Sequence, residues 1–111
     1  MTMATFQEQL STLPATDDIA AIVLLNPAGE AVHRLENQPG TAGSLRVYHA
    51  LVKRHGHIDR KAAREGLELF AEHTAAARAA PGSHPNIDRL LAIAEDNAPG
   101  LRARVVLASE S

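Results

Sequence analysis

Apolar and polar residues follow each other along the chain in patterns that predict both helices and strands. Phe6, Leu10 and Leu13 are spaced by four and three residues, which is the spacing of one helical face. They predict a short packing helix over residues 4–13. Residues 19–25 are apolar without interruption, as expected of a strand that is covered on both faces.

A hairpin and a loop are predicted after this strand. Residues 26–29 read NPAG and predict a turn, because proline presets one backbone angle and glycine tolerates a positive one. Residues 30–35 are more polar and predict a second strand at the edge of a sheet. The two glycines and the proline of residues 38–44 predict a loop, with Ser44 as the N-cap of the following helix.

Two helices are predicted in the middle of the chain. Apolar residues recur at steps of three and four over residues 45–55, and Gly56 ends this helix. The longest helical pattern then covers residues 60–80, with Asp59 as its N-cap and a proline and a glycine at 81–82 as its end. Its apolar residues form two adjoining stripes, so we expect this long helix to contact both the sheet and another helix.

The long helix carries further expectations. Gly66 costs about 1 kcal/mol relative to alanine in a helix interior, so we expect another element to pack closely against it. The remaining face is charged, and its opposite charges are spaced to pair along the helix, which is typical of a solvated surface. At 1.5 Å per residue, a helix of about 21 residues is about 30 Å long, so its two ends are not expected to share a ligand.

The rest of the chain predicts one more helix and the last strand. A third long helix begins at residues 86–88 and ends before the proline and glycine at 99–100. Residues 101–107 alternate between apolar and polar side chains, which is the period of a strand with one polar side. The most hydrophobic strand usually takes the centre, so the expected order is hairpin strand, first strand, last strand. The predicted fold is therefore α+β: a small three-stranded sheet, made of the hairpin and the C-terminal strand, packed against about four helices.

Two similar segments stand at predicted helix starts. Residues 57–60 read HIDR and residues 86–89 read NIDR. We expect a shared arrangement in which Asp59 and Asp88 lie near the positive end of each helix and the preceding isoleucine anchors the entering chain.

Size and composition narrow the classes of function. The 111 residues, of which 45% are hydrophobic, predict a single compact domain over residues 1–111. Eleven Lys and Arg against thirteen Asp and Glu give a net charge of −2 without long blocks of one sign, so we expect neither nucleic acid nor a membrane surface as the partner. The chain has no cysteine, which excludes disulfides and thiolate metal sites. It has no basic leader and no apolar run of about 18 residues, so we expect a cytoplasmic protein.

A resemblance to a known family is carried by three segments, GSLRVYHAL, AREGLELFAEHTAAAR and PGSHPNIDRLLAI. In this order they resemble a family of short bacterial proteins known only as a domain of unknown function. The resemblance covers nearly the whole chain, which implies a single domain. It implies no activity, cofactor or partner, and it assigns no functional residue.

Histidine is the residue type with the clearest chemical signal. The chain has six histidines, and five of them lie in its middle part: His49, His55, His57, His73 and His84. Neutral imidazole binds zinc, copper, nickel or iron, and a carboxylate of Asp59, Glu72 or Asp88 could complete a site. The chain has no HExxH motif and no pair of histidines four residues apart, which favours a structural role for each histidine. The alternative to these structural roles is a metal site at the exit of the long helix, with His73, His84 and Asp88 as its ligands.

Two weaker signals concern anions. The glycine-rich residues 40–43 before Ser44 are similar to a phosphate-binding turn, but the lysine of the P-loop is missing, which favours a plain loop. Arg102 and Arg104 lie on the polar side of the last strand and, with Arg34, predict a small anion or RNA patch that lacks aromatic residues for base stacking.

These observations favour a noncatalytic binding or regulatory module. Its expected partner is another protein or a second copy of the chain, bound through the edge strand of the hairpin or through a helical face. The alternative is a small metal-binding protein or metal-dependent enzyme that uses His73 and His84. Apart from a divalent metal in that alternative, we expect no cofactor.

Overall fold

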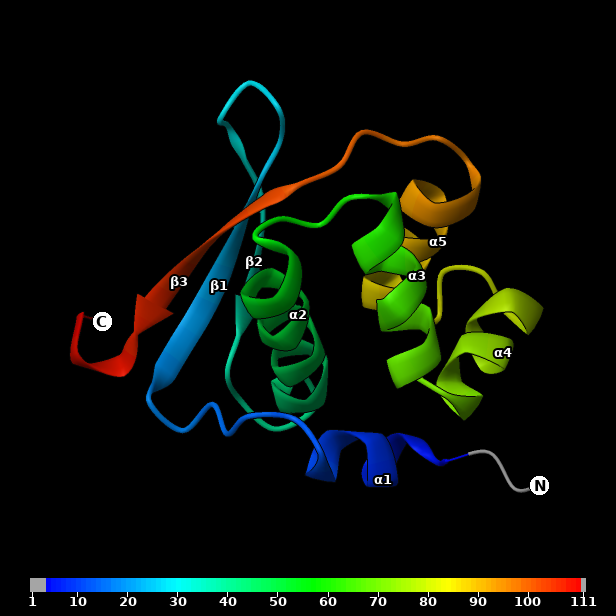
Figure 1. The fold of residues 1–111 in the computed structure, drawn as a ribbon, viewed down its shortest axis with the longest axis horizontal. Helices are drawn as coiled ribbons and strands as arrows, with labels where there is room; N and C mark the ends of the chain where they lie inside the picture. Colours follow the sequence, from blue (N-terminus) through cyan, green and yellow to red (C-terminus); the bar gives the residue numbers. More distant parts are fainter. Residues whose placement is uncertain (1–3, 111) are drawn as a thin grey trace.

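The computed structural model describes residues 4–110 and confirms the α+β fold. A three-stranded sheet lies on one side of the molecule and the helices lie on the other (Figure 1). Within the described part of the chain, no helix is long and apolar enough to cross a membrane. In chain order the elements are α1 (Phe6–Ser11), β1 (Ile19–Leu25), β2 (Ala31–Glu36), α2 (Ala42–His55), α3 (Arg60–Leu69), α4 (Glu72–Ala79), α5 (Pro85–Glu95), β3 (Arg102–Leu107) and the 3-10 helix η1 (Ala108–Glu110).

The sheet has the strand order β2-β1-β3, as the hydrophobicity of the strands predicted. Both pairings are antiparallel, and Leu35 of β2 and Val105 of β3 lie opposite Ile22 of the central strand. β1 is buried along most of its length, as its uninterrupted apolar sequence predicted. A second, smaller apolar cluster forms apart from the main core: Ala21, Val23 and Val106.

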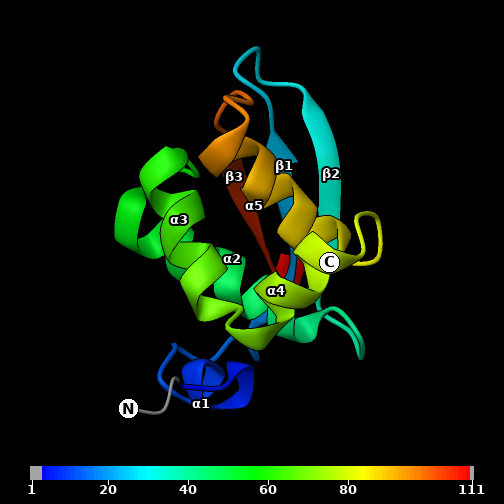
Figure 2. The same cartoon turned by 90° about the vertical axis from the view of Figure 1, so that its right-hand side faces the viewer.

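The main core lies between the sheet and the helices: α2 packs on β1 and β2, and α3 packs on both α2 and α5 (Figure 2). Leu51 of α2 and Leu90 of α5 have no exposed surface. A Cβ atom at Gly66 of α3 would lie 2.7 Å from Cδ1 of Leu90 and 2.8 Å from Cδ1 of Leu51. The predicted close packing at Gly66 is therefore confirmed, and it joins three helices at one point.

The single long helix predicted over residues 60–80 is wrong. The chain forms α3 up to Leu69 and begins α4 at Glu72, so the helical pattern is broken between them. Ala71 has a φ of 51° at this break. Because the two helices turn at a corner, the expected separation of about 30 Å between the ends of one straight helix does not apply.

Side-chain contacts explain why the break occurs without glycine or proline. The hydroxyl of Thr74 donates to the carbonyl oxygen of Leu67 (2.6 Å) and so satisfies a carbonyl at the end of α3. Phe70 is 2% exposed and becomes buried at the corner. The positive φ of Ala71, in a sparsely populated backbone region, costs of order 1–3 kcal/mol, and the burial of Phe70 offsets that cost.

Helix α2 begins earlier than predicted. Ser44 is not its N-cap, because the helix starts at Ala42 and Thr41 occupies the capping position. The hydroxyl of Thr41 donates to the carbonyl oxygen of Glu36 (2.7 Å) and thereby joins the start of α2 to the end of β2. Gly56 ends the helix with a φ of 81°, as predicted.

The two similar segments begin their helices in different ways. Asp59 is the N-cap of α3 and accepts from the backbone N–H of Ala62 (2.8 Å), as predicted. Asp88 lies inside the first turns of α5, which begins at Pro85, and it accepts from the backbone N–H of Gly82 (2.8 Å). Both aspartates thus lie near the positive end of their helix, as predicted, but only Asp59 is an N-cap, because proline takes the first position of α5 and Asp88 falls within its first turn.

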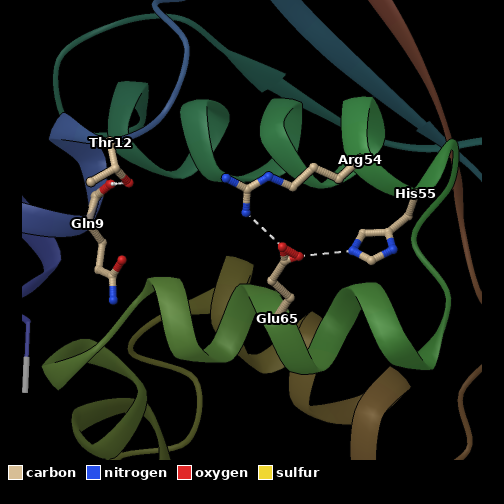
Figure 3. A network of polar contacts seen from close by, with 5 residues as sticks. All are labelled: Gln9, Thr12, Arg54, His55 and Glu65. Atoms are coloured by element: carbon tan, nitrogen blue, oxygen red, sulfur yellow. Dashed lines mark hydrogen bonds and ion pairs between the residues drawn. The ribbon is translucent and has the colours of Figure 1, made fainter.

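The charged face of α3 forms ion pairs with α2, whereas pairs along the helix were expected. Glu65 accepts from Nη1 of Arg54 (2.7 Å) and lies 3.0 Å from Nε2 of His55 (Figure 3). The hydrogen bond from His55 is the main cause that lowers the pKa of Glu65, and Arg54 lowers it further. His55 is in the last turn of α2 as predicted, but its partner is a carboxylate of the neighbouring helix.

Candidate functional site

A cleft of about 630 Å³ lies where α1, the start of α2, the α3–α4 corner and the start of α5 meet. Its walls combine apolar side chains, three histidines and the backbone of the loop before α2. The larger apolar side chains and the imidazoles that line the cleft are those of Phe6, Leu10, Phe70, Pro85, Ile87, His33, His73 and His84.

Phe6 of α1 forms one wall of this cleft and is held on several sides. Its ring stacks on Phe70 with 5.4 Å between centroids and meets the ring of His73 edge-on at 4.9 Å. A Cβ atom at Gly43 would lie 3.2 Å from the Phe6 ring, so α2 passes close to it. The backbone N–H of Phe6 also donates to a carboxylate oxygen of Glu72 (2.7 Å). These contacts fix α1 against the corner between α3 and α4.

The predicted histidine pair lies in the cleft. The ring centroids of His73 and His84 are 6.0 Å apart, because the corner after α3 turns α4 toward the start of α5. Asp88 is engaged by the backbone N–H of Gly82. Residues 4–110 contain no group of three or more histidine and carboxylate side chains placed to hold a metal ion. A metal here would rest on the two imidazoles, and the metal site stays a prediction.

The remaining predicted histidines lie elsewhere. His55 pairs with Glu65, and Nε2 of His57 lies 3.4 Å from the carboxylate of Asp59. Nδ1 of His49 is buried without a hydrogen-bond partner in the described part of the chain. Burial, and then Lys53, lower the pKa of His49. The five mid-chain histidines therefore do not converge on one point.

His33 of β2 is the site residue that sequence reasoning missed. It lines the cleft and also a second cavity of about 320 Å³ between β2 and α5. His33 thus contributes to the walls of both cavities. Partial burial, and then the nearby Arg89, lower the pKa of His33. The available signal was the period of two in the hairpin strand, which puts His33 on the same face as the buried Leu35.

Arg89 of α5 stands in the wall of the second cavity. Its Nη1 donates to the hydroxyl oxygen of Tyr48 (3.1 Å) and to the side-chain oxygen of Asn86 (2.9 Å). The guanidinium also lies 5.8 Å from the centre of the Tyr48 ring. Tyr48 is buried and donates to the backbone oxygen of Asn86 (2.5 Å), and burial raises the pKa of its hydroxyl to about 12.

The outer edge of β2 lies beside both cavities. The backbone N–H of Asn37 donates to the oxygen of Ala20 (2.9 Å), which sets the alternation of the antiparallel ladder. By this alternation, the backbone groups of His33 and Leu35 face β1, and those of Arg34 face away from the sheet. The hydroxyl of Thr41 caps the outward oxygen of Glu36. The outward carbonyl oxygen of Glu36 is therefore occupied, whereas the outward backbone N–H and C=O of Arg34 are available to a further strand.

The three arginines of the predicted anion patch share one region of the sheet. Arg34 and Arg104 both lie opposite Val23, on either side of the central strand, and Arg102 lies opposite Leu25. All three side chains are exposed, and Arg34 pairs with Glu36 (2.5 Å). Their grouping is as predicted, and an anionic ligand for them stays a prediction.

Comparisons with known proteins identify the family. No curated protein and no solved structure matches the chain. A family profile matches residues 6–104, which span nearly the whole sequence and all three strands up to Arg104. The chain therefore belongs to the bacterial family DUF2322, described as an uncharacterized protein conserved in bacteria.

Proposed function

We propose that this protein is a noncatalytic binding or regulatory module that takes an extended segment of a partner protein along the edge of β2. The observation that carries the proposal is the position of His33, which lines both the cleft and the second cavity. We refer to these two cavities, which share His33 in their walls and lie on the inner side of β2, as the groove.

The backbone of β2 supports this mode of binding. The outward N–H and C=O of Arg34 are available to a further strand, and sheet edges of this kind bind extended segments through main-chain hydrogen bonds. An added strand would place every second side chain on the inner side of the sheet, where the groove lies. The exposed apolar residue Val32 and the partly exposed Leu101, which line the second cavity, would then be removed from water.

The histidines of the cleft support binding more than catalysis. His73 packs on the ring of Phe6, and His84 packs beside His73. Contacts of this kind hold imidazoles as parts of an aromatic wall. A general base is instead positioned by hydrogen bonds to its substrate or nucleophile.

Selection from a displayed library of random peptides tests the proposal. Peptides enriched on the wild-type protein should shift the amide signals of His33 to Glu36 in a ¹⁵N-labelled sample. Arg34→Pro removes the outward N–H without breaking the β1–β2 ladder, so it should abolish binding. Arg34→Ala keeps the N–H and serves as the matched control. Enriched peptides that shift other signals, or that bind Arg34→Pro equally well, would refute the proposal.

A second copy of the chain is one form that the partner can take. Two β2 edges can pair with each other across a twofold axis. Size-exclusion chromatography with light scattering at several protein concentrations tests this form. A dimer that Arg34→Pro dissociates supports it, and a monomeric mass at every concentration removes it.

Metal binding is the second candidate, and the contact between His73 and His84 favours it. Two imidazoles supply part of a zinc or copper site, and other ligands would have to complete it. Metal analysis of the native protein and melting curves with divalent ions test this candidate. The stabilisation should be lost in His73→Ala and kept in His57→Ala. The candidate fails if no metal copurifies and no ion raises the melting temperature.

A further inference from the structure

We infer that Arg89 binds a carboxylate in the second cavity, and that this carboxylate belongs to an Asp or Glu side chain of the partner segment. The inference rests on the proposed binding along β2. It adds a requirement on the sequence of the partner, namely an acidic residue on the inner side of the added strand.

The first support is the incomplete set of partners of Arg89. The guanidinium offers five N–H donors in a planar fork. Its hydrogen bonds go to two neutral oxygens, on Tyr48 and Asn86, and both use Nη1. Among residues 4–110, no Asp or Glu forms an ion pair with it. Arg89 is half-buried, so it carries a positive charge in a wall of the cavity without a counter-charge.

The surroundings of Arg89 favour an anion over a neutral ligand. Much of the rest of the cavity wall is apolar, with contributions from Val32, Ile93 and Leu101. Charges attract more strongly where water is excluded, and the planar fork of arginine matches the two oxygens of a carboxylate. The contacts to Tyr48 and Asn86 fix the guanidinium before a ligand arrives, which reduces the entropy lost on binding.

The register of the sheet identifies the source of the carboxylate. A side chain opposite His33 on an added strand would have its Cβ about 5 Å from that of His33, on the inner side of the sheet. His33 and Arg89 line the same cavity. An acidic side chain at this position of the added strand would therefore enter the cavity beside the guanidinium. A small free carboxylate has the same chemistry, but it would leave the backbone of Arg34 unpaired.

Three synthetic peptides test the inference. Each is about eight residues long, alternates valine and threonine, and carries Glu, Gln or Lys at one central position. Titration of each peptide into ¹⁵N-labelled protein gives its dissociation constant and the residues that it shifts. The Glu peptide should bind about tenfold more tightly than the Gln peptide, and the Lys peptide should bind most weakly.

Variants of the protein test whether Arg89 causes the preference for the Glu peptide over the Gln peptide. Arg89→Gln should abolish the difference between the Glu and Gln peptides. Arg102→Gln removes an arginine from β3 and should leave the difference unchanged. If Arg89→Gln does not fold, Arg89→Lys keeps the charge without the fork and should retain only part of the preference.

The outcomes separate this inference from the proposed function. Equal binding of the Glu and Gln peptides along β2 would overturn the inference and leave the function standing. A preference that persists in Arg89→Gln would also overturn it. If no peptide shifts the signals of β2, both the proposed function and the inference fail. If acetate shifts the signals of Arg89 while the Glu peptide does not, the carboxylate does not come from an added strand.

Discussion

On one side of α5, Leu90 approaches α3 so closely that a Cβ atom at Gly66 would lie 2.7 Å from its Cδ1. On another side of the same helix, Arg89 and Ala92 line a cavity of about 320 Å³ that separates them from β2. Apolar side chains fill the contact between α5 and α3, whereas the cavity between α5 and β2 is lined in part by the charged Arg89 and the imidazole of His33. The comparison indicates that tight apolar packing is concentrated in the α2–α3–α5 contact, and that the side of α5 facing β2 is less tightly packed.

Removing the side chain of Leu90 from its contact with α3 should have the largest effect on the stability of the fold. Leu90 is fully buried, so Leu90→Ala should lower the free energy of unfolding by about 3 kcal/mol through lost transfer energy and a cavity. Urea denaturation measures this loss. Leu91 is half-buried on the same helix, and Leu91→Ala is the matched control with a smaller expected loss. Equal losses in the two variants would contradict the comparison.

Overfilling the same contact should have a smaller effect. Gly66→Ala improves helix propensity by about 1 kcal/mol, but the new methyl group collides with Leu51 and Leu90. We expect a net loss of about 1 kcal/mol, because overpacking costs more than propensity returns. The loss should be smaller in a Leu90→Ala background, where one of the two collisions is removed, and a double-mutant cycle measures this coupling. A Gly66→Ala variant more stable than the wild type would contradict the close contact.

The ion pairs between α2 and α3 should contribute less than the apolar contact. Glu65→Gln should cost roughly 0.5–1 kcal/mol at pH 7, because Arg54 and His55 lose a charged partner. The pKa of Glu65 is lower in the folded protein than its ordinary value of 4.5. Its stabilisation is therefore fully present above pH 4.5 and is lost as pH falls through the lowered pKa. Denaturation midpoints at several pH values should show the two proteins converging in acid. A constant difference across that range would contradict this assignment.

Filling the groove should have the smallest effect on stability. Ala92 lines the second cavity, so Ala92→Leu should change the free energy of unfolding by less than about 0.5 kcal/mol. The same substitution should weaken binding of the Glu peptide, because the added side chain occupies the space that the segment needs. Ala75→Leu on the exposed surface of α4 is the control that should leave binding unchanged. A large loss of stability in Ala92→Leu would show that this side of α5 is closed as well.

Much of the fold could be predicted from local patterns. The uninterrupted apolar run of residues 19–25 placed the central strand, and Gly66 indicated the close packing of helices. The break at Ala71 could not be predicted, because it depends on the hydroxyl of Thr74 and on burial of Phe70 against Phe6. The contact between Phe6 and Phe70 joins segments that are distant in sequence, and helical periodicity indicates neither this contact nor the hydrogen bond of Thr74.

The candidate site was predicted only in part. His73 and His84 were expected near each other because both stand at the exit of one helical segment. His33 lies far from them in sequence and reaches the same cleft through the pairing of β2 with β1. The unpaired charge of Arg89 is equally invisible in sequence, since its neighbours Tyr48 and His33 come from α2 and β2. A site built from several elements requires the tertiary structure.

Amide hydrogen exchange at Arg34 is the most direct test of binding along β2. In the free protein the outward N–H of Arg34 should exchange rapidly, because it faces away from the sheet. When the Glu peptide is bound, exchange at Arg34 should slow by about tenfold or more, while the amide of Ala103 on the opposite edge strand stays unchanged. Unchanged exchange at Arg34 with the peptide bound would contradict the addition of a strand to β2.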